Sequence, residues 1–353
     1  MRRRLHFLLV AAAIILIPLI IAVWWWFYWP TFHRNRLLAD ARRLLDAGQP
    51  ARAEEALLPL IKEQPDDLRV QFLYAQALRR SGRNREASIA LQRSVQLGLP
   101  ESEGLREYAL VQAAGDFKLA EGALQKVLQA EPNDAEAAEA LARGYARSQR
   151  WLEAERSFTH LLDREPERQE FRLGRAKVRL ELGRYDPAAA DLRKLLEVAP
   201  KHFEARLLLA HCLLSNAHVA EAEKELLLCR KLQPAHAGPL IGLANCALEQ
   251  GELDRAQKLI QEAVTLAPLD PLALHVQGTL FLRRQRYDLA IPVYERLLTR
   301  NPRDKEAHLK LAQALSQTGA LARAQEHQDK FQQLDRAEAE RERLRHVGIF
   351  KDP

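Results

Sequence analysis

A unit of 34 residues repeats along most of this 353-residue chain, and the repeat limits the folds that the chain can adopt. The stretch RRQRYDLAIPVYERLLTRNPRD at 283–304 matches RSQRWLEAERSFTHLLDREPER at 147–168 in its arginines, aromatic residues, Leu-Leu pair and proline. A fixed period of this length is typical of arrays of stacked supersecondary units. Nine units follow one another at 34–67, 68–100, 101–134, 135–168, 169–202, 203–236, 237–270, 271–304 and 305–338.

Small residues recur at two points of each unit. Within a unit, two stretches have apolar residues spaced by three and four, which predicts two amphipathic helices. Where two helices cross closely only a small side chain fits. One column of small residues reads Ala53, Ala87, Ala120, Ala154, Ala188, Ala222, Ala256, Ala290 and Ala324. The other reads Ala41, Ala75, Tyr108, Ala142, Ala176, Ala210, Ala244, Gly278 and Ala312.

Glycines and prolines divide the units. A glycine between the two helices allows the chain to leave the first helix with a positive φ. Prolines near the end of a unit stop the second helix. The glycines are Gly48, Gly82, Gly115, Gly183, Gly251 and Gly319, and the prolines are Pro65, Pro132, Pro166, Pro200, Pro234, Pro268 and Pro302.

This pattern resembles the tetratricopeptide repeat (TPR) family over residues 34–338. The resemblance implies an all-α protein, a right-handed α-solenoid of about nine helix–turn–helix repeats. Four residues depart from the pattern. Tyr108 stands where a small residue is expected, Arg179 stands where an apolar one is expected, and Pro59 and Pro292 fall inside second helices, which predicts local strain or kinks. The charged segment 339–353 is expected to extend or cap the last helix and to end in a tail.

An apolar run precedes the array. Residues 1–6 form a basic tail, residues 7–29 contain no charge, and residues 30–33 form a short linker. The run is long enough to cross the ~30 Å hydrocarbon layer as a helix. It ends in the aromatic residues 24–29, which favour a membrane–water interface and make a poor cleavage site. We therefore predict an uncleaved single-pass anchor.

Flanking charge leaves the orientation of this anchor open, because arginines lie on both sides of the run. A short tail of three arginines is hard to translocate, whereas a long domain crosses largely regardless of its charge. We expect the N-terminus inside and the array on the outer, periplasmic face of the plasma (inner) membrane. A cytosolic array is the alternative.

The rest of the sequence contains no sign of catalysis or nucleic-acid binding. The net charge is +6, but five arginines beside the apolar run leave only about +1 on residues 37–353. No phosphate loop, nucleophile elbow or zinc-protease motif is present. The cysteines Cys212, Cys229 and Cys246 occupy apolar positions of the repeat, which favours a core role. We expect no metal, no cofactor, no small-molecule substrate and no enzymatic activity.

In the resembled family, the first helices of the pairs line a concave groove that holds a peptide or a protein segment. Residues spaced by four and three on these helices form a polar row with apolar neighbours. The alternative is that the leucines pack between helices and the polar row is merely solvated. The candidate groove residues are Arg143, Leu173, Lys177, Leu180, Leu207, His211, Leu214, Ile241, Asn245 and Leu248.

Three functions fit these features. The first is a membrane-anchored scaffold that recruits a protein for envelope, secretion or complex-assembly work. The second is a cytosolic adaptor that brings a soluble protein to the membrane. The third is an enzyme within the array, for which the sequence contains no cluster of titratable groups.

Alkaline phosphatase fused after Pro353 should be active in a bacterial host, because the predicted orientation exports the C-terminal end of the chain. Phosphatase activity of cells that carry the fusion is the measurement. An inactive fusion, together with an active cytosolic reporter at the same point, would place the array inside the cell.

Overall fold

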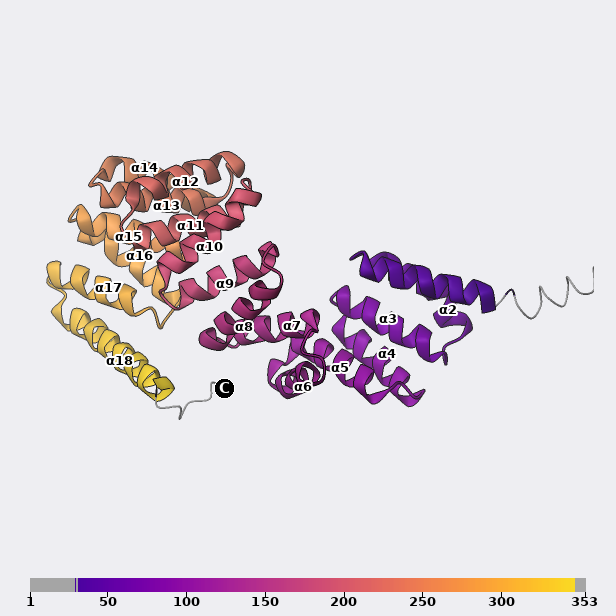
Figure 1. The fold of residues 1–353 in the computed structure, drawn as a ribbon. Coiled ribbons are helices and arrows are strands. Elements are labelled where there is room, and N and C mark those ends of the chain that lie inside the picture. Colours follow the sequence, from indigo (N-terminus) through magenta and orange to yellow (C-terminus); the bar gives the residue numbers. More distant parts are fainter. Residues whose placement is uncertain (1–28, 30, 347–353) are drawn as a thin grey trace, which may run out of the picture. The chain divides into compact units, whose positions relative to one another are not determined.

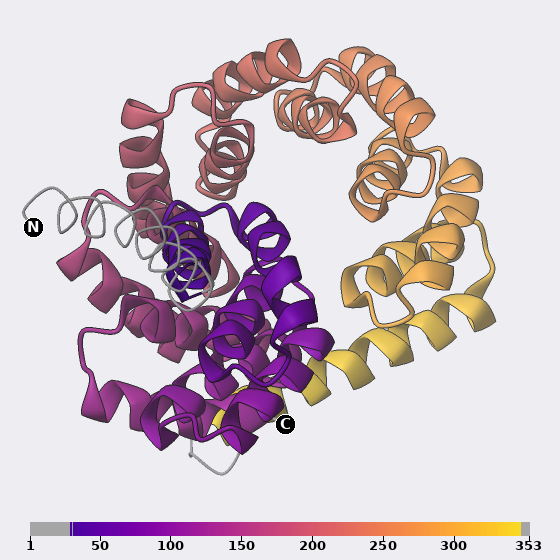
Figure 2. The ribbon, with the colours of Figure 1, turned by 90° about the vertical axis from the view of Figure 1, so that its right-hand side faces the viewer.

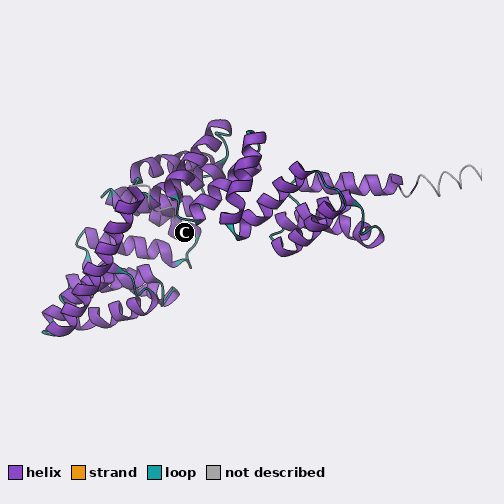
Figure 3. Cartoon of the chain, turned by 90° about the horizontal axis from the view of Figure 1, so that it is seen from below, coloured by secondary structure: helices purple, strands orange, loops and turns teal. Residues whose placement is uncertain are grey.

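The described part of the protein is entirely helical. The computed structural model in Figure 1 describes Trp29 and residues 31–346, and Figure 3 shows only helices and connecting loops there. No helix in this part of the chain is both long enough and apolar enough to cross a bilayer. The predicted membrane span at 7–29 lies outside the described residues except for Trp29.

Eighteen helices form nine consecutive pairs in this part of the chain. The first helix covers residues 31–46. The others are α2 (Pro50–Glu63), α3 (Leu68–Arg80), α4 (Asn84–Gln96), α5 (Glu101–Gly115), α6 (Phe117–Ala130), α7 (Ala135–Arg147), α8 (Trp151–Arg164), α9 (Gln169–Glu181), α10 (Tyr185–Val198), α11 (Phe203–Ser215), α12 (Val219–Leu232), α13 (Ala237–Glu249), α14 (Leu253–Leu266), α15 (Pro271–Arg283), α16 (Tyr287–Arg300), α17 (Lys305–Gln317) and α18 (Leu321–His346). The expected all-α array of helix pairs is confirmed.

The chain divides into two compact units, residues 1–144 and 145–353, and the boundary falls inside α7. In the second unit each helix packs against the next one along the chain, and α13 also contacts both α11 and α15. In the described residues, successive second helices do not pack against one another as the first helices α11, α13 and α15 do. Figure 2 shows the helix pairs of this unit following one another around an arc. The closer spacing of the first helices places them on the inner side of this arc.

The small residues occupy the helix crossings as predicted. In the second-helix column, every alanine from Ala53 to Ala290 is fully buried, and Ala324 is 8% exposed. Gly278 illustrates the steric limit, because a Cβ there would lie 2.6 Å from the Tyr294 ring. That distance is shorter than any normal contact, so the crossing between α15 and α16 requires a residue without a side chain.

The crossing residue of α5 is Ala109 and not Tyr108, which corrects the sequence-based assignment. Ala109 is fully buried, whereas Tyr108 is 44% exposed. Ala109 follows Ala75 by 34 residues and is the ninth residue of α5, and the missing residue of the repeat lies between Ala109 and Ala120, which are 11 residues apart instead of 12. The unit therefore keeps the small residue that the pattern requires.

Most turns between paired helices have the expected left-handed residue. Gly183 and Gly251 have φ values of +68° and +76°, and Ala217 takes the same role with φ +59°. Gly115 does not, because it is the last residue of α5 and only Asp116 separates α5 from α6. The expected positive φ at Gly115 is therefore wrong, and the shorter turn explains why.

Arg179 does not disturb the core despite standing at an apolar position of the repeat. Its guanidinium donates to Glu155 and Asp191, both at 2.8 Å. Arg175 makes a second ion pair with Asp191 at 2.7 Å. Asp191 is only 3% exposed, so its charge is balanced by two arginines instead of by water.

Ala109→Leu should destabilise the protein by about 1–3 kcal/mol, because the crossing between α5 and α6 has no room for a larger side chain. Tyr108→Leu should cost much less, because Tyr108 is partly exposed. Chemical denaturation followed by circular dichroism measures both changes. If Tyr108→Leu were the more damaging substitution, the assignment of Ala109 to the crossing would be wrong.

Candidate functional site

A groove of about 750 Å³ lies across three successive first helices, α11, α13 and α15. We call it the C-terminal groove. Its lining comes from these helices, from the link between α12 and α13 and from the link between α14 and α15. The lining residues are Leu207, Leu208, His211, Leu214, Leu226, Ala235, His236, Ala237, Gly238, Ile241, Gly242, Asn245, Leu266, Ala267, Asp270, Leu272, His275 and Val276.

The width of the groove depends on α13, whose groove face carries little side-chain volume. Gly238 and Gly242 lie one helical turn apart on that face. A Cβ at Gly242 would lie 2.6 Å from Leu226 Cδ2, so the glycine also lets α12 approach closely. At the rim, Leu272 is 68% exposed and Leu266 is 45% exposed. The groove therefore presents aliphatic side chains to solvent beside an open helix face.

Two polar side chains of the groove, Asp270 and His236, are hydrogen-bonded to backbone groups of the protein itself. Asp270 accepts hydrogen bonds from the backbone N–H groups of Leu272 and Ala273, at 2.8 and 3.0 Å. His236 Nδ1 accepts from the Gly238 N–H at 3.0 Å, which fixes that ring nitrogen as unprotonated. Both groups thus cap helices. In the described structure, the Asn245 side chain has no hydrogen-bond partner and remains available to a ligand.

The surroundings of His211 favour the neutral form of its ring, although part of the side chain is exposed to solvent. Its ring meets the edge of Tyr185 at a centroid distance of 6.3 Å. Desolvation by the surrounding apolar side chains lowers the pKa of His211 below its ordinary value and outweighs the opposite effect of Glu181. A neutral imidazole can donate and accept one hydrogen bond each, which suits a backbone ligand.

The structure brings five of the ten predicted groove residues together in the C-terminal groove, namely Leu207, His211, Leu214, Ile241 and Asn245. The others lie elsewhere. Leu173 and Leu180 are half-buried against the core around α9 to α12. Lys177 pairs with Glu204 at 2.6 Å, so its charge is already engaged. Arg143 belongs to the first compact unit and pairs with Glu139 on its own helix at 2.5 Å.

Leu248 is a core residue, and its assignment to the groove is wrong. It is 1% exposed and packs with Val276 and Leu280 of the next first helix. The equivalent neighbours of Leu214, one repeat earlier, are Gly242 and Cys246. Because these are smaller, Leu214 stays half-buried beside the groove while Leu248 is covered.

Leu272 and His275 line the groove but were not predicted. His275 Nε2 lies 3.3 Å from a Glu306 carboxylate oxygen, and the ring meets Tyr294 edge-on. His275 follows Leu207 and Ile241 at the repeat spacing, and Leu272 follows Gly238. Extending the predicted stripe by one unit would have found His275. No pattern marks Leu272, which stands where every other unit has a polar residue or glycine.

The three cysteines are core residues, as predicted. Cys212, Cys229 and Cys246 are fully buried and free. Burial raises the pKa of each thiol to about 11, which disfavours the reactive thiolate. Among the residues that the structure describes, no group of three or more His, Cys, Asp or Glu side chains is arranged to hold a metal ion.

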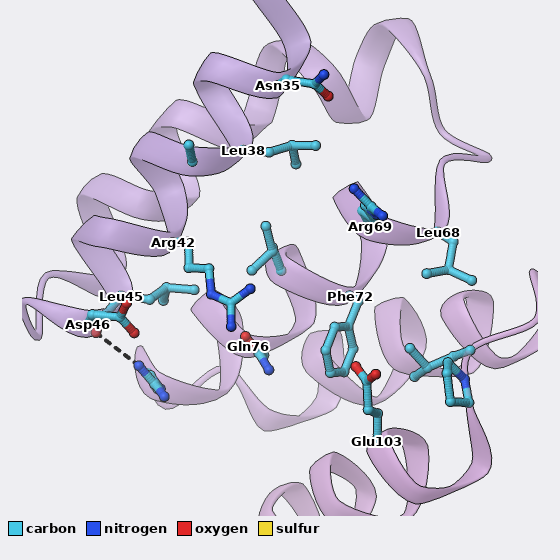
Figure 4. Close-up of a pocket in the computed structure, with 15 residues that line it drawn as sticks. Asn35, Leu38, Arg42, Leu45, Asp46, Leu68, Arg69, Phe72, Gln76 and Glu103 are labelled. Carbon is cyan, nitrogen blue, oxygen red and sulfur yellow. Dashed lines mark hydrogen bonds between the residues drawn. The ribbon is translucent and has the colours of Figure 1, made fainter. Parts of the chain in front are cut away.

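A second groove, of about 830 Å³, lies in the first compact unit between the helix at 31–46, α3 and the start of α5. We call it the N-terminal groove. Figure 4 shows Arg42 and Gln76 projecting into it from facing helices, with Phe72 on one wall. Arg80 Nη1 donates to the Leu45 carbonyl at 2.9 Å (dashed line in Figure 4). None of its lining residues is among the predicted groove residues.

Comparisons with known sequences point to one family. A sequence model described as tetratricopeptide repeat matches residues 38–98, 139–190 and 275–339. A second model with the same description matches residues 179–231. No curated protein matches the chain.

Several solved structures share the fold at low sequence identity. A chain of the APC/C hetero-tetramer Cut9–Hcn1 is 16% identical, with a TM-score of 0.55 over 79% of this chain and 55% of that chain. The human IFIT1 dimer with m7Gppp-AAAA is 19% identical, with a TM-score of 0.50 over 80% of this chain and 72% of that chain. YrrB, a TPR protein with an unusual peptide-binding site, is 18% identical, with a TM-score of 0.40 over 64% of this chain and 98% of that chain.

Acidification from pH 7.5 to 5.5 should destabilise the protein. The unfolded chain protonates His211 near the ordinary pKa of about 6.5, and the folded chain only at lower pH. The stability that neutral His211 contributes is therefore present above about pH 6.5 and is lost below it, and the loss is small because the side chain is exposed and solvent screens its charge. His327, whose pKa is lowered mainly by burial, adds to the same loss.

Urea unfolding at a series of pH values measures this effect. His211→Gln should flatten the pH dependence, and His218→Gln, at an exposed turn outside the groove, should leave it unchanged. Equal slopes for wild type and His211→Gln would contradict the desolvation of His211.

Proposed function

Because the chain belongs to the tetratricopeptide repeat family, we propose that it is a binding scaffold that holds a segment of a partner protein in the C-terminal groove. Such arrays are stable stacks of helix pairs that offer an extended surface to partners. The Cut9–Hcn1 hetero-tetramer is an example of a similarly folded chain assembled with other chains. This proposal assigns binding, and no catalytic step, to the protein.

One observation carries the proposal, which is an aliphatic groove that three neighbouring first helices leave open. Leu266 and Leu272 are exposed at its rim, and Ile241 lies at its floor. Grooves of several hundred cubic ångströms with apolar walls and a few polar groups are typical of ligand sites. Exposed aliphatic side chains in such a cluster favour a protein contact.

The chemistry of the groove favours an apolar partner segment over a charged one. The Asn245 amide and the neutral His211 ring can bond a peptide backbone, which carries both donors and acceptors. Lys177, a cation of the predicted groove, is already paired with Glu204 and does not attract a ligand carboxylate. We therefore propose an uncharged stripe of aliphatic side chains as the ligand, in a helical or extended segment.

We also propose that residues 7–29 anchor the scaffold in the plasma (inner) membrane with the array on the outer face. This part of the proposal rests on the apolar run, its aromatic end and the basic tail. In that location the scaffold would serve envelope, secretion or complex-assembly work. The alternative adaptor, with the array in the cytosol, has the same groove and is separated by the phosphatase fusion.

Leu272→Glu and Asn245→Ala should each weaken partner capture by about tenfold or more, roughly 1.4 kcal/mol. The first places a charge where an aliphatic ligand sits, and the second removes the free amide. A photocrosslinking amino acid at position 245 in cells, followed by mass spectrometry, identifies the partner. Pull-down titration with that partner then measures each affinity.

Two matched variants control for effects on folding and surface charge. Leu321→Glu changes a leucine that is 66% exposed at the start of α18, close to the 68% of Leu272. Gln261→Ala removes an exposed amide on α14 that does not line the groove. Both should bind normally. Full capture by folded Leu272→Glu and Asn245→Ala proteins would show that the partner binds elsewhere.

A further inference from the structure

The N-terminal groove contains arginines that the protein itself does not neutralise. Among the arginines described in the first unit, only those at 42, 69 and 85 have no side-chain ion pair or hydrogen bond, and Arg42 and Arg69 line this groove. Their neighbours differ. Arg79 and Arg106, for example, are paired with buried or half-buried carboxylates at 2.5 Å. Unpaired guanidinium groups concentrated in one groove indicate a ligand that brings the missing carboxylates.

Guanidinium groups bind carboxylates through two parallel N–H···O bonds, which makes arginine selective for this partner. Arg42 and Arg69 lie on two different helices, the helix at 31–46 and α3. A free chain end supplies one carboxylate and can satisfy one of them. An internal segment with two acidic side chains can satisfy both, and it fits a groove that crosses three helices.

The groove is not uniformly positive, and this limits the anion that it can accept. Asp46 and Glu103 also line it, both exposed and without an ion pair. Asp46 is one helical turn from Arg42, yet no ion pair joins them. A polyanion such as single-stranded RNA would place further phosphates against these carboxylates. A segment with a small number of acidic side chains avoids that repulsion.

The walls of the groove add an apolar requirement. Phe72 is half-buried and faces the open space (Figure 4), and Leu68 and Leu73 of the same helix also line the groove. Gln76 projects into the groove from the same helix and can bond a ligand backbone. An aromatic or aliphatic ligand side chain next to the acidic ones would cover Phe72.

We propose that the N-terminal groove is a second binding site, for an internal protein segment with at least two acidic side chains beside an apolar one. Its chemistry differs from that of the C-terminal groove, which takes an uncharged aliphatic segment. The two grooves lie in different compact units of the chain and share no residue. The scaffold therefore has separate sites for two unlike segments.

Selection of displayed random peptides on the purified full-length protein tests this site. The peptides are fused at their C-terminal ends, so none has a free terminal carboxylate, and the pool is counter-selected on the Arg42→Gln/Arg69→Gln variant. Enriched peptides should combine Asp or Glu with Leu or Phe. Fluorescence polarisation of labelled, amidated peptides should then give at least about a tenfold loss of affinity in the double variant.

Three controls make the outcome specific. Arg85→Gln removes the third unpaired arginine, outside the groove, and should not change affinity. Leu272→Glu disrupts only the C-terminal groove and should not change it either, so the two proposals can fail separately. Arg42→Lys/Arg69→Lys, which keeps the charges but not the paired donors, should give an intermediate loss. Circular dichroism confirms that each variant is folded.

The proposal is overturned if the enriched peptides show no excess of acidic residues, or if folded Arg42→Gln/Arg69→Gln protein keeps full affinity for them. It is also overturned if a single-stranded RNA oligonucleotide binds more tightly than the peptides and displaces them, because the site would then recognise phosphates. A selective loss in the double variant alone supports it.

Discussion

Every other feature of this protein depends on the close crossing of two helices at a small residue. The alanines at the second-helix crossings are almost all completely buried, and at Gly278 even a Cβ would collide with Tyr294. Such a narrow pair can stack on the next pair with first helix against first helix, as α11, α13 and α15 do. The row of first helices then leaves grooves between them, and only the side chains at each point decide whether a groove is filled.

Most of the fold could be predicted from the sequence because each crossing is local to one unit. Both helices of a pair lie within 34 residues, so the pattern of one unit carries the whole constraint. The two wrong predictions of the fold, for Tyr108 and Gly115, both fall at the turn between α5 and α6, which is shorter than in other units. The crossing residues Ala109 and Ala120 are 11 residues apart instead of 12, so the missing residue lies between them and Ala109, not Tyr108, is at the crossing. The one-residue turn between α5 and α6 also removes the need for a left-handed Gly115. The 34-residue spacing from Ala75 leads to Ala109, and only the assignment of the missing residue to 68–100 placed Tyr108 in the column.

The candidate groove could be predicted only in part, because exposure depends on the neighbouring unit. Leu214 and Leu248 hold the same position of the repeat, but Leu248 meets Val276 and Leu280 where Leu214 meets smaller residues. The same dependence hid Leu272, whose exposure follows from its place at the rim of a groove and not from any local pattern. Positions within a unit can be read from one sequence, whereas the fit between units requires coordinates.

The charge of each groove also depends on the neighbouring units, and this dependence explains why the two grooves differ. Many arginines of this chain pair with acids about one repeat away, as Arg106 does with Asp134 and Arg283 with Glu249. Such pairs join neighbouring units and together neutralise most of the positive charge of the array. Composition therefore shows that residues 37–353 are nearly neutral, but it does not reveal which arginines have no acidic partner. Arg42 and Arg69 remain because no acid of the adjoining units reaches them. The same repeat geometry thus produces an uncharged groove at α13 and, between the helix at 31–46 and α3, a groove with two unpaired guanidinium groups. One fold can therefore select two chemically unlike ligands.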